Sequence, residues 1–125
     1  MLKMPVEISI DVEMDDIPVR GNVLASGDKA KDKAAEDEIL RRLDAGDVWA
    51  WCFVRVKAKL GPFEGFDSLG SFSYRDEEDF MRDDYYRGMV KLAVEDLEEE
   101  MKRAVEKGKE AEALLSLRTF WEIQP

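Results

Sequence analysis

The sequence of 125 residues has no histidine and a single cysteine, Cys52. Histidine is the side chain that most often transfers protons near neutral pH, and it is a ligand in most zinc sites. An acid-base catalytic site and a zinc site would therefore both lack their usual side chain. One cysteine excludes an intramolecular disulfide and fits a reducing compartment. We therefore expect a protein that is not an enzyme and holds no cofactor or metal, with Cys52 buried as a small apolar residue.

Long apolar runs are also missing. No stretch approaches the ~18 apolar residues of a membrane-spanning helix, and the first residues lack the apolar core and cleavage site of a signal peptide. The formal net charge of −10 opposes binding to bare duplex DNA or to an anionic membrane. These features predict a cytoplasmic protein.

The residues that are present suffice for a folded core. Hydrophobic residues make up 45% of the chain and include three Trp, six Phe and three Tyr, which argues against disorder even though 38% of the residues are charged. We expect one domain spanning residues 1–125.

The first third of the chain predicts a strand followed by a helix. Apolar and acidic residues alternate in "VEISIDVEM", as in a half-buried strand. Residues 28–46 have apolar side chains at helical spacing, with Asp28 or Ser26 as the N-cap and Gly46 at the C-terminal stop.

Two further strands are predicted in the middle of the chain. Residues 47–60 alternate and end at Gly61, where the chain turns. A return strand follows over residues 63–74, in which Gly65 and Gly70 indicate a bulge or the close approach of another backbone.

Apolar residues spaced by three and four predict one long helix from Asp76 to Gly108. We expect Gly108 to end or bend it, and residues 111–123 to form a shorter helix or an extended segment in which Trp121 packs. The element order β-α-β-β-α-α predicts an α+β fold, with a mostly antiparallel three-stranded sheet packed against two or three helices.

Negative charge is concentrated on this long helix. Between Asp76 and Glu100 there are eleven acids and three bases, a local net charge of −8. A solvated helix face is one interpretation. A surface that imitates nucleic acid is another, because an α-helix rises ~1.5 Å per residue and duplex DNA presents one charge per ~1.7 Å. A site for a hard cation is the third, although no calcium-loop pattern is present.

One face of the strand over residues 47–60 is predicted to carry three aromatic residues and then three bases. Aromatic side chains beside bases suit single-stranded nucleic acid, which makes an accessory nucleic-acid-binding module an alternative function. We favour packing of the aromatic residues beneath a helix, with the bases extending into solvent or pairing with acids of the long helix. The six residues are Trp49, Trp51, Phe53, Arg55, Lys57 and Lys59.

The stretch from Ile17 to Ala58, with "RGNVLASGD" and "GDVWAW" as its distinctive parts, resembles small acidic proteins encoded by bacteriophages, prophages and plasmids. With "GFDSLGSFSYRDEEDF", the resemblance covers roughly half of the chain. It implies no activity and carries over no functional residue. It does imply a genomic setting in which small acidic proteins often resemble inhibitors of host nucleic-acid machinery, such as anti-CRISPR and anti-restriction proteins.

We therefore predict an inhibitor from a phage or mobile element that acts in the host cytoplasm as a monomer or homodimer. Its acidic helix is expected to act as a nucleic-acid mimic and to bind the basic surface of a host nucleic-acid-binding protein, of the CRISPR-effector or restriction type. A self-associating phage assembly protein is a further alternative. The residues expected to bind the partner are Asp76, Glu77, Glu78, Asp79, Asp83, Asp84, Tyr85, Glu95, Glu98 and Glu99.

Overall fold

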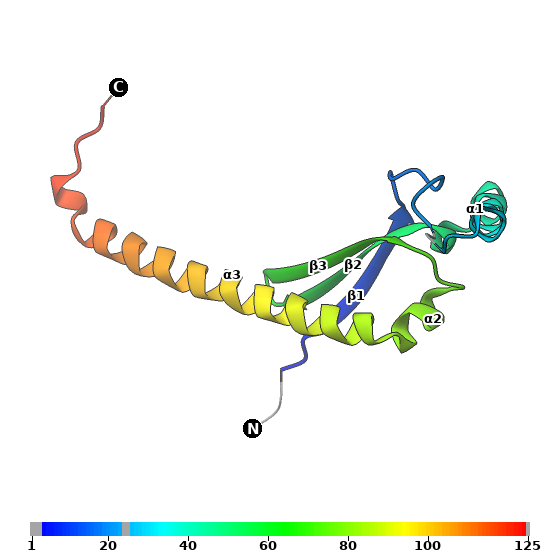
Figure 1. Ribbon diagram of the computed structural model, residues 1–125. Helices are drawn as coiled ribbons and strands as arrows, with labels where there is room; N and C mark the ends of the chain where they lie inside the picture. Colours follow the sequence, from blue (N-terminus) through cyan, green and yellow to red (C-terminus); the bar gives the residue numbers. More distant parts are fainter. Residues whose placement is uncertain (1–3, 24–25, 125) are drawn as a thin grey trace.

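The computed structural model describes residues 4–23 and 26–124. The predicted α+β class and the order β-α-β-β-α-α are confirmed (Figure 1). The elements are β1 (Glu7–Met14), α1 (Lys29–Asp44), the 3-10 turn η1 (Val48–Ala50), β2 (Cys52–Leu60), β3 (Phe63–Phe72), α2 (Glu77–Arg82), α3 (Asp84–Ser116) and the 3-10 turn η2 (Arg118–Phe120).

The three strands form an antiparallel sheet with β2 in the centre. Alternate residues of a strand point to opposite faces, and Val54, Val56 and Ala58 are fully buried on one face of β2. Figure 1 shows that α3 runs along the sheet, and its buried residues Met89 and Leu97 belong to the same core cluster. The core therefore lies between α3 and one face of the sheet, and the other face carries the bases of β2.

Gly65 allows α3 to pack closely on β3. A Cβ added to Gly65 would lie 2.7 Å from the Cα of Leu97 and would overlap the carbonyl oxygen of Ala93. The predicted close approach at Gly65 is therefore confirmed. The predicted bulge is also present, because the register between β2 and β3 shifts at Gly70 and Ser71.

A second, smaller core lies where α1 meets η1. Asp28 caps α1, as predicted, by accepting hydrogen bonds from two backbone nitrogens of the first turn. Figure 1 shows α1 beyond the end of the sheet, so this helix does not take part in the layer formed by α3. The buried residues of this core are Val19, Ile39, Ala50 and Trp51.

The single helix predicted from Asp76 to Gly108 begins where expected, with Asp76 as its N-cap, but it is wrong in its continuity and at its C-terminal end. The chain is extended at Asp83 (φ −74°, ψ 143°), which separates α2 from α3. Gly108 lies inside α3, which continues to Ser116. A helical glycine costs only about 1 kcal/mol relative to alanine, and the Lys, Glu, Ala and Leu residues around Gly108 favour helix strongly enough to continue it.

Candidate protein-binding surface

Three of the acids predicted to bind a partner form hydrogen bonds that stabilise the local structure. Asp76 caps α2 by accepting a hydrogen bond from the backbone nitrogen of Asp79 at 2.9 Å. Asp79 accepts one from the backbone nitrogen of Arg75, which lowers the pKa of the Asp79 carboxyl. Asp83 caps α3 and also accepts a hydrogen bond of 3.2 Å from the hydroxyl of Tyr74. These carboxylates have structural roles, whatever else they bind.

Acids and bases alternate along the side of α3 that faces away from the sheet. Residues spaced by three and four form one line on a helix, and this line contains three acids and three bases. Asp84 also pairs with Arg87 at 3.1 Å. This line along α3 is therefore close to neutral and is not a continuous acidic stripe. Its members are Asp84, Arg87, Lys91, Glu95, Glu98 and Lys102. Asp84, in the first turn, also borders a groove on the β3 side.

A groove of about 500 Å³ lies between β3 and the first turns of α3. Three carboxylates line it, those of Asp67, Asp83 and Asp84, and no basic residue does. Its apolar side is formed by Leu69, Met89 and Leu92 together with Tyr85. The Tyr85 side chain is 54% exposed, and its ring packs edge-on against Phe72 at 5.3 Å.

A second hollow of about 360 Å³ lies further along the same two elements. Its lining again contains three carboxylates and no base. Asp96 of α3 accepts a hydrogen bond from the backbone nitrogen of Phe66 at 2.8 Å, which fixes the helix to the edge of β3. We call the two hollows together the acidic groove. Its six acids are Glu64, Asp67, Asp83, Asp84, Asp96 and Glu100.

The acidic groove contains only three of the ten residues predicted to bind a partner, namely Asp83, Asp84 and Tyr85. Glu77 and Glu78 are exposed on α2, and Glu95, Glu98 and Glu99 are exposed on α3 outside the groove lining. The sequence prediction missed Glu64 and Asp67 because it treated β3 and the helix separately. Gly65, which marks the close approach of α3, was the available signal that these β3 residues border the helix.

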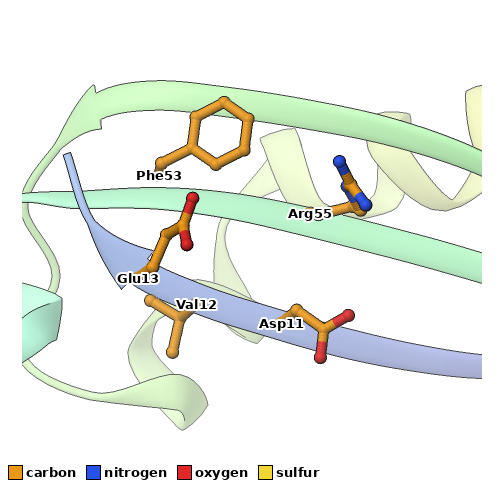
Figure 2. A pocket seen from close by; sticks show the side chains of 5 residues that line it. All are labelled: Asp11, Val12, Glu13, Phe53 and Arg55. Carbon is orange, nitrogen blue, oxygen red and sulfur yellow. The ribbon is translucent and has the colours of Figure 1, made fainter. Parts of the chain in front are cut away.

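The open face of the sheet carries a row of bases with acids across from each end. In the register of the strands, Lys59 lies between Glu7 and Glu64, and Asp11 lies opposite Arg55. Figure 2 shows Asp11 and Glu13 of β1 beside Phe53 and Arg55 of β2 around a hollow of about 160 Å³. The bases therefore face acids of neighbouring strands, and the predicted alternative of pairing with the long helix is wrong for Lys57, which pairs with Glu64 at 3.9 Å.

The two tryptophans do not share this face, because β2 begins only at Cys52. Trp51 is 3% exposed in the small core beside α1, and its indole nitrogen donates to the carbonyl oxygen of Ile17 at 2.8 Å. Trp49 lies in η1 and packs against Phe80 of α2. The preferred interpretation, packing beneath helices, holds for both tryptophans. Of the three predicted aromatic residues only Phe53 remains near the bases, where the ring of Phe66 of β3 also lies 5.0 Å from the Arg55 guanidinium. A stacking platform of three aromatic residues is therefore not formed.

Cys52 is fully buried, as predicted, and burial raises its pKa to about 11. Such a thiol is protonated at neutral pH and is a poor nucleophile. In residues 4–23 and 26–124, no cluster of three or more potential ligands is arranged to hold a metal ion. Within the same residues, no helix combines the length and the apolar character required to cross a membrane.

Comparison with protein-family models, with curated proteins and with solved structures found no match to this chain.

Proposed function

We propose that this protein is a binding protein whose acidic groove receives a basic segment of a protein partner. The observation that carries the proposal is that two hollows along β3 and α3 are each lined by three carboxylates and by no base. Three of these six carboxylates pair with bases that lie outside the linings: Glu64 with Lys57, Asp84 with Arg87 and Glu100 with Arg103. The apolar floor and the exposed ring of Tyr85 add a surface that can be desolvated on binding, and interface energy is usually concentrated in such aromatic anchors. A lysine or arginine side chain suits this combination, because its stem is apolar and its head is cationic.

Within that class, we propose an inhibitor that occupies a nucleic-acid-binding site. From Asp83 to Glu100 the helix rises ~26 Å, so six carboxylates give roughly one carboxylate per 4 Å. A basic cleft would replace the ion pairs that three of them make with Lys57, Arg87 and Arg103. One strand of nucleic acid presents a phosphate per ~3.4 Å. The charge density thus supports imitation of a single strand better than of a duplex. The resemblance to proteins of phages and plasmids favours a host defence protein, of the CRISPR-effector or restriction type, as the target.

The mechanism of inhibition would be competition for the cleft that normally holds phosphates. Complementary charge accelerates encounter with a basic cleft. Once bound, the carboxylates would pair with the lysine and arginine side chains that otherwise neutralise phosphates, and nucleic acid would be excluded. No covalent step is required.

The test is affinity capture from a nuclease-treated bacterial lysate with three forms of the protein. The first is the wild type. The second is Asp67→Lys/Glu100→Lys, which places one lysine in each hollow of the acidic groove. The third is Glu95→Lys/Glu98→Lys on the outward side of α3, which changes the net charge by the same +4. None of these four carboxylates accepts a backbone hydrogen bond in the described residues.

We expect the wild type and the third form to capture the same nucleic-acid-binding protein, and the second form to lose it. Capture should also weaken when salt rises from about 0.1 M to about 1 M, which shortens the Debye length from about 10 Å to about 3 Å. Equal capture by all three forms would contradict a role for the acidic groove. Equal loss in both variants would show that only total charge matters.

A further inference from the structure

The last part of α3 lies beyond the sheet and packs against no other element of the described chain except its own end. Figure 1 shows the sheet ending beside the middle of α3 while the helix continues. Every residue from Val105 to Gln124 is exposed. Several of these exposed residues have large apolar side chains, and Phe120 is the example with 82% of its surface exposed. The other large apolar residues of this segment are Val105, Leu114, Leu115, Leu117, Trp121 and Ile123.

An isolated helix of this length is only marginally stable in water, and exposed leucines add an unfavourable contact with solvent. The segment Lys102–Ser116, here called the distal helix, therefore has the character of a docking element. Leu115, with the small residues Ala104, Gly108 and Ala111, continues the stripe that begins at Leu97 with spacings of four and three, which is the pattern of a coiled-coil seam. The seam residues are Leu97, Met101, Ala104, Gly108, Ala111 and Leu115.

The charge of the distal helix suits a second copy of the same chain. The whole chain carries −10, so most surfaces of two copies repel each other. The distal helix carries four bases and three acids, a net charge of +1. Two copies can therefore meet here without strong repulsion. Arg118, just beyond the helix, also adds a cation that suits the acidic turn Glu98–Glu100 of another copy.

The direction of pairing follows from the position of the sheet. The seam lies on the side of α3 that faces the sheet, because its first residue, Leu97, is buried against the sheet. Two helices paired in parallel through this seam would bring both sheets into the same space. Antiparallel pairing places the two sheets at opposite ends of the joined helices, so no such overlap arises.

We propose that the distal helix is the interface of an antiparallel homodimer. The register that aligns the seams sets Ala104 opposite Leu115 of the other copy, and Gly108 opposite Ala111. Leu115 of each copy then faces Ala104 of the other, which allows interdigitation. The same register brings Arg118 of each copy to the level of Met101 in the other, beside the acidic turn Glu98–Glu100.

The first test is sedimentation equilibrium of purified protein over a dilution series, with two matched variants. Ala111→Glu places a charge in the seam, and Ala113→Glu makes the same change on the outward side of the same turn. We expect the wild type to approach twice its monomer mass of 14.4 kDa as concentration rises. Ala111→Glu should raise the dissociation constant at least about tenfold, since a buried unpaired charge is strongly unfavourable. Ala113→Glu should change it by less than about threefold.

The second test is disulfide cross-linking, which reports direction. In the antiparallel register, Ala104→Cys mixed with Leu115→Cys should give a cross-linked heterodimer. Ala104→Cys alone should not cross-link, because its two copies would be ~16 Å apart along the axis and a disulfide needs Cα atoms within about 7 Å. Cys52 does not interfere, because it is buried.

A wild type that remains monomeric at all concentrations would overturn the proposal. So would equal weakening by the two glutamate variants, or self-cross-linking of Ala104→Cys. Far-UV circular dichroism of each variant confirms that the helix still forms. The six acids of the acidic groove are unchanged in all of these variants, so a variant that stays monomeric can be tested for partner binding on its own.

Discussion

Gly65 of β3 lies directly beneath Leu97 of α3, so closely that the position has no room for a side chain. Van der Waals contact with a helix backbone cannot be relieved by rotating a side chain. This contact therefore fixes the distance between the helix and the edge of the sheet, and with it the geometry of the acidic groove.

Gly65→Ala is accordingly expected to destabilise the fold by about 3 kcal/mol, the upper end of typical overpacking effects. Gly88→Ala is the matched control, since a Cβ at Gly88 meets open space. In a helix it should stabilise by about 0.5–1 kcal/mol. Urea unfolding of both variants measures the difference, and a neutral Gly65→Ala would mean that α3 is not seated on β3 in this way.

Asp83 combines two functions, capping α3 and accepting the Tyr74 hydroxyl. Asp83→Ala should lower the free energy of unfolding by about 2 kcal/mol, because a helix cap is lost and a half-buried hydroxyl loses its partner. Asp84→Ala, at the next residue, removes only an exposed ion pair with Arg87 and should have little effect. Thermal or chemical unfolding distinguishes the two, and equal effects would argue against the cap.

Arg42 joins α1 to the segment before α2. Its guanidinium donates to the carbonyl oxygen of Tyr74 at 2.6 Å and pairs with Asp47 at 2.8 Å. The neighbouring Arg41 pairs with Glu38 on the surface of the same helix. We expect Arg42→Ala to lower the free energy of unfolding by about 1.5–3 kcal/mol, the range for hydrogen bonds to charged groups.

Arg41→Ala serves as the control and should leave stability unchanged within error. If the two arginine variants unfolded at the same urea concentration, the contacts of Arg42 would contribute nothing measurable to the free energy of unfolding.

The buried thiol of Cys52 makes stability depend on alkaline pH. Its pKa in the folded protein, about 11, lies above the ordinary value of 9.0. The unfolded chain therefore releases this proton first, so the stabilisation is complete below pH 9 and is lost as the pH rises towards 11. Burial also raises the pKa of Tyr74, which extends the loss to higher pH.

Urea unfolding from about pH 8.5 to about pH 11 should show a steeper loss of stability in the wild type than in Cys52→Ala. The thiol of the native protein should also react slowly with alkylating reagents below that range. Fast labelling of the native protein at neutral pH would contradict the burial of Cys52.

Local patterns predicted most elements of this fold. The alternation in "VEISIDVEM" predicted β1, and Asp28 was correctly expected to cap α1. These features are visible in the sequence because they depend on residues within one turn or one strand. The boundary at Asp83 was missed because an acid between two helical stretches fits a helix surface and a helix cap equally well.

The candidate site was harder to predict, because it depends on which residues meet across elements. Asp67 and Asp96 are far apart in the chain and belong to the acidic groove only because α3 packs along β3. The acids Glu95 and Glu98, which looked equivalent in sequence, lie on the outward side beside Lys91 and Lys102. Helical periodicity places residues on a face, but only packing decides which face borders β3.

By itself, the sequence determined the class of fold, the excess of negative charge, the burial of Cys52 and the presence of a bulge or a close approach at Gly65 and Gly70, since each depends on composition or on short-range pattern. Only the tertiary structure decided that the acids of α3 divide between a mixed outward side and an acidic groove, that the tryptophans leave the basic face of β2, and that the distal helix extends past the sheet. The physical reason is that these features depend on where the sheet ends relative to a helix, and that position is set by long-range packing.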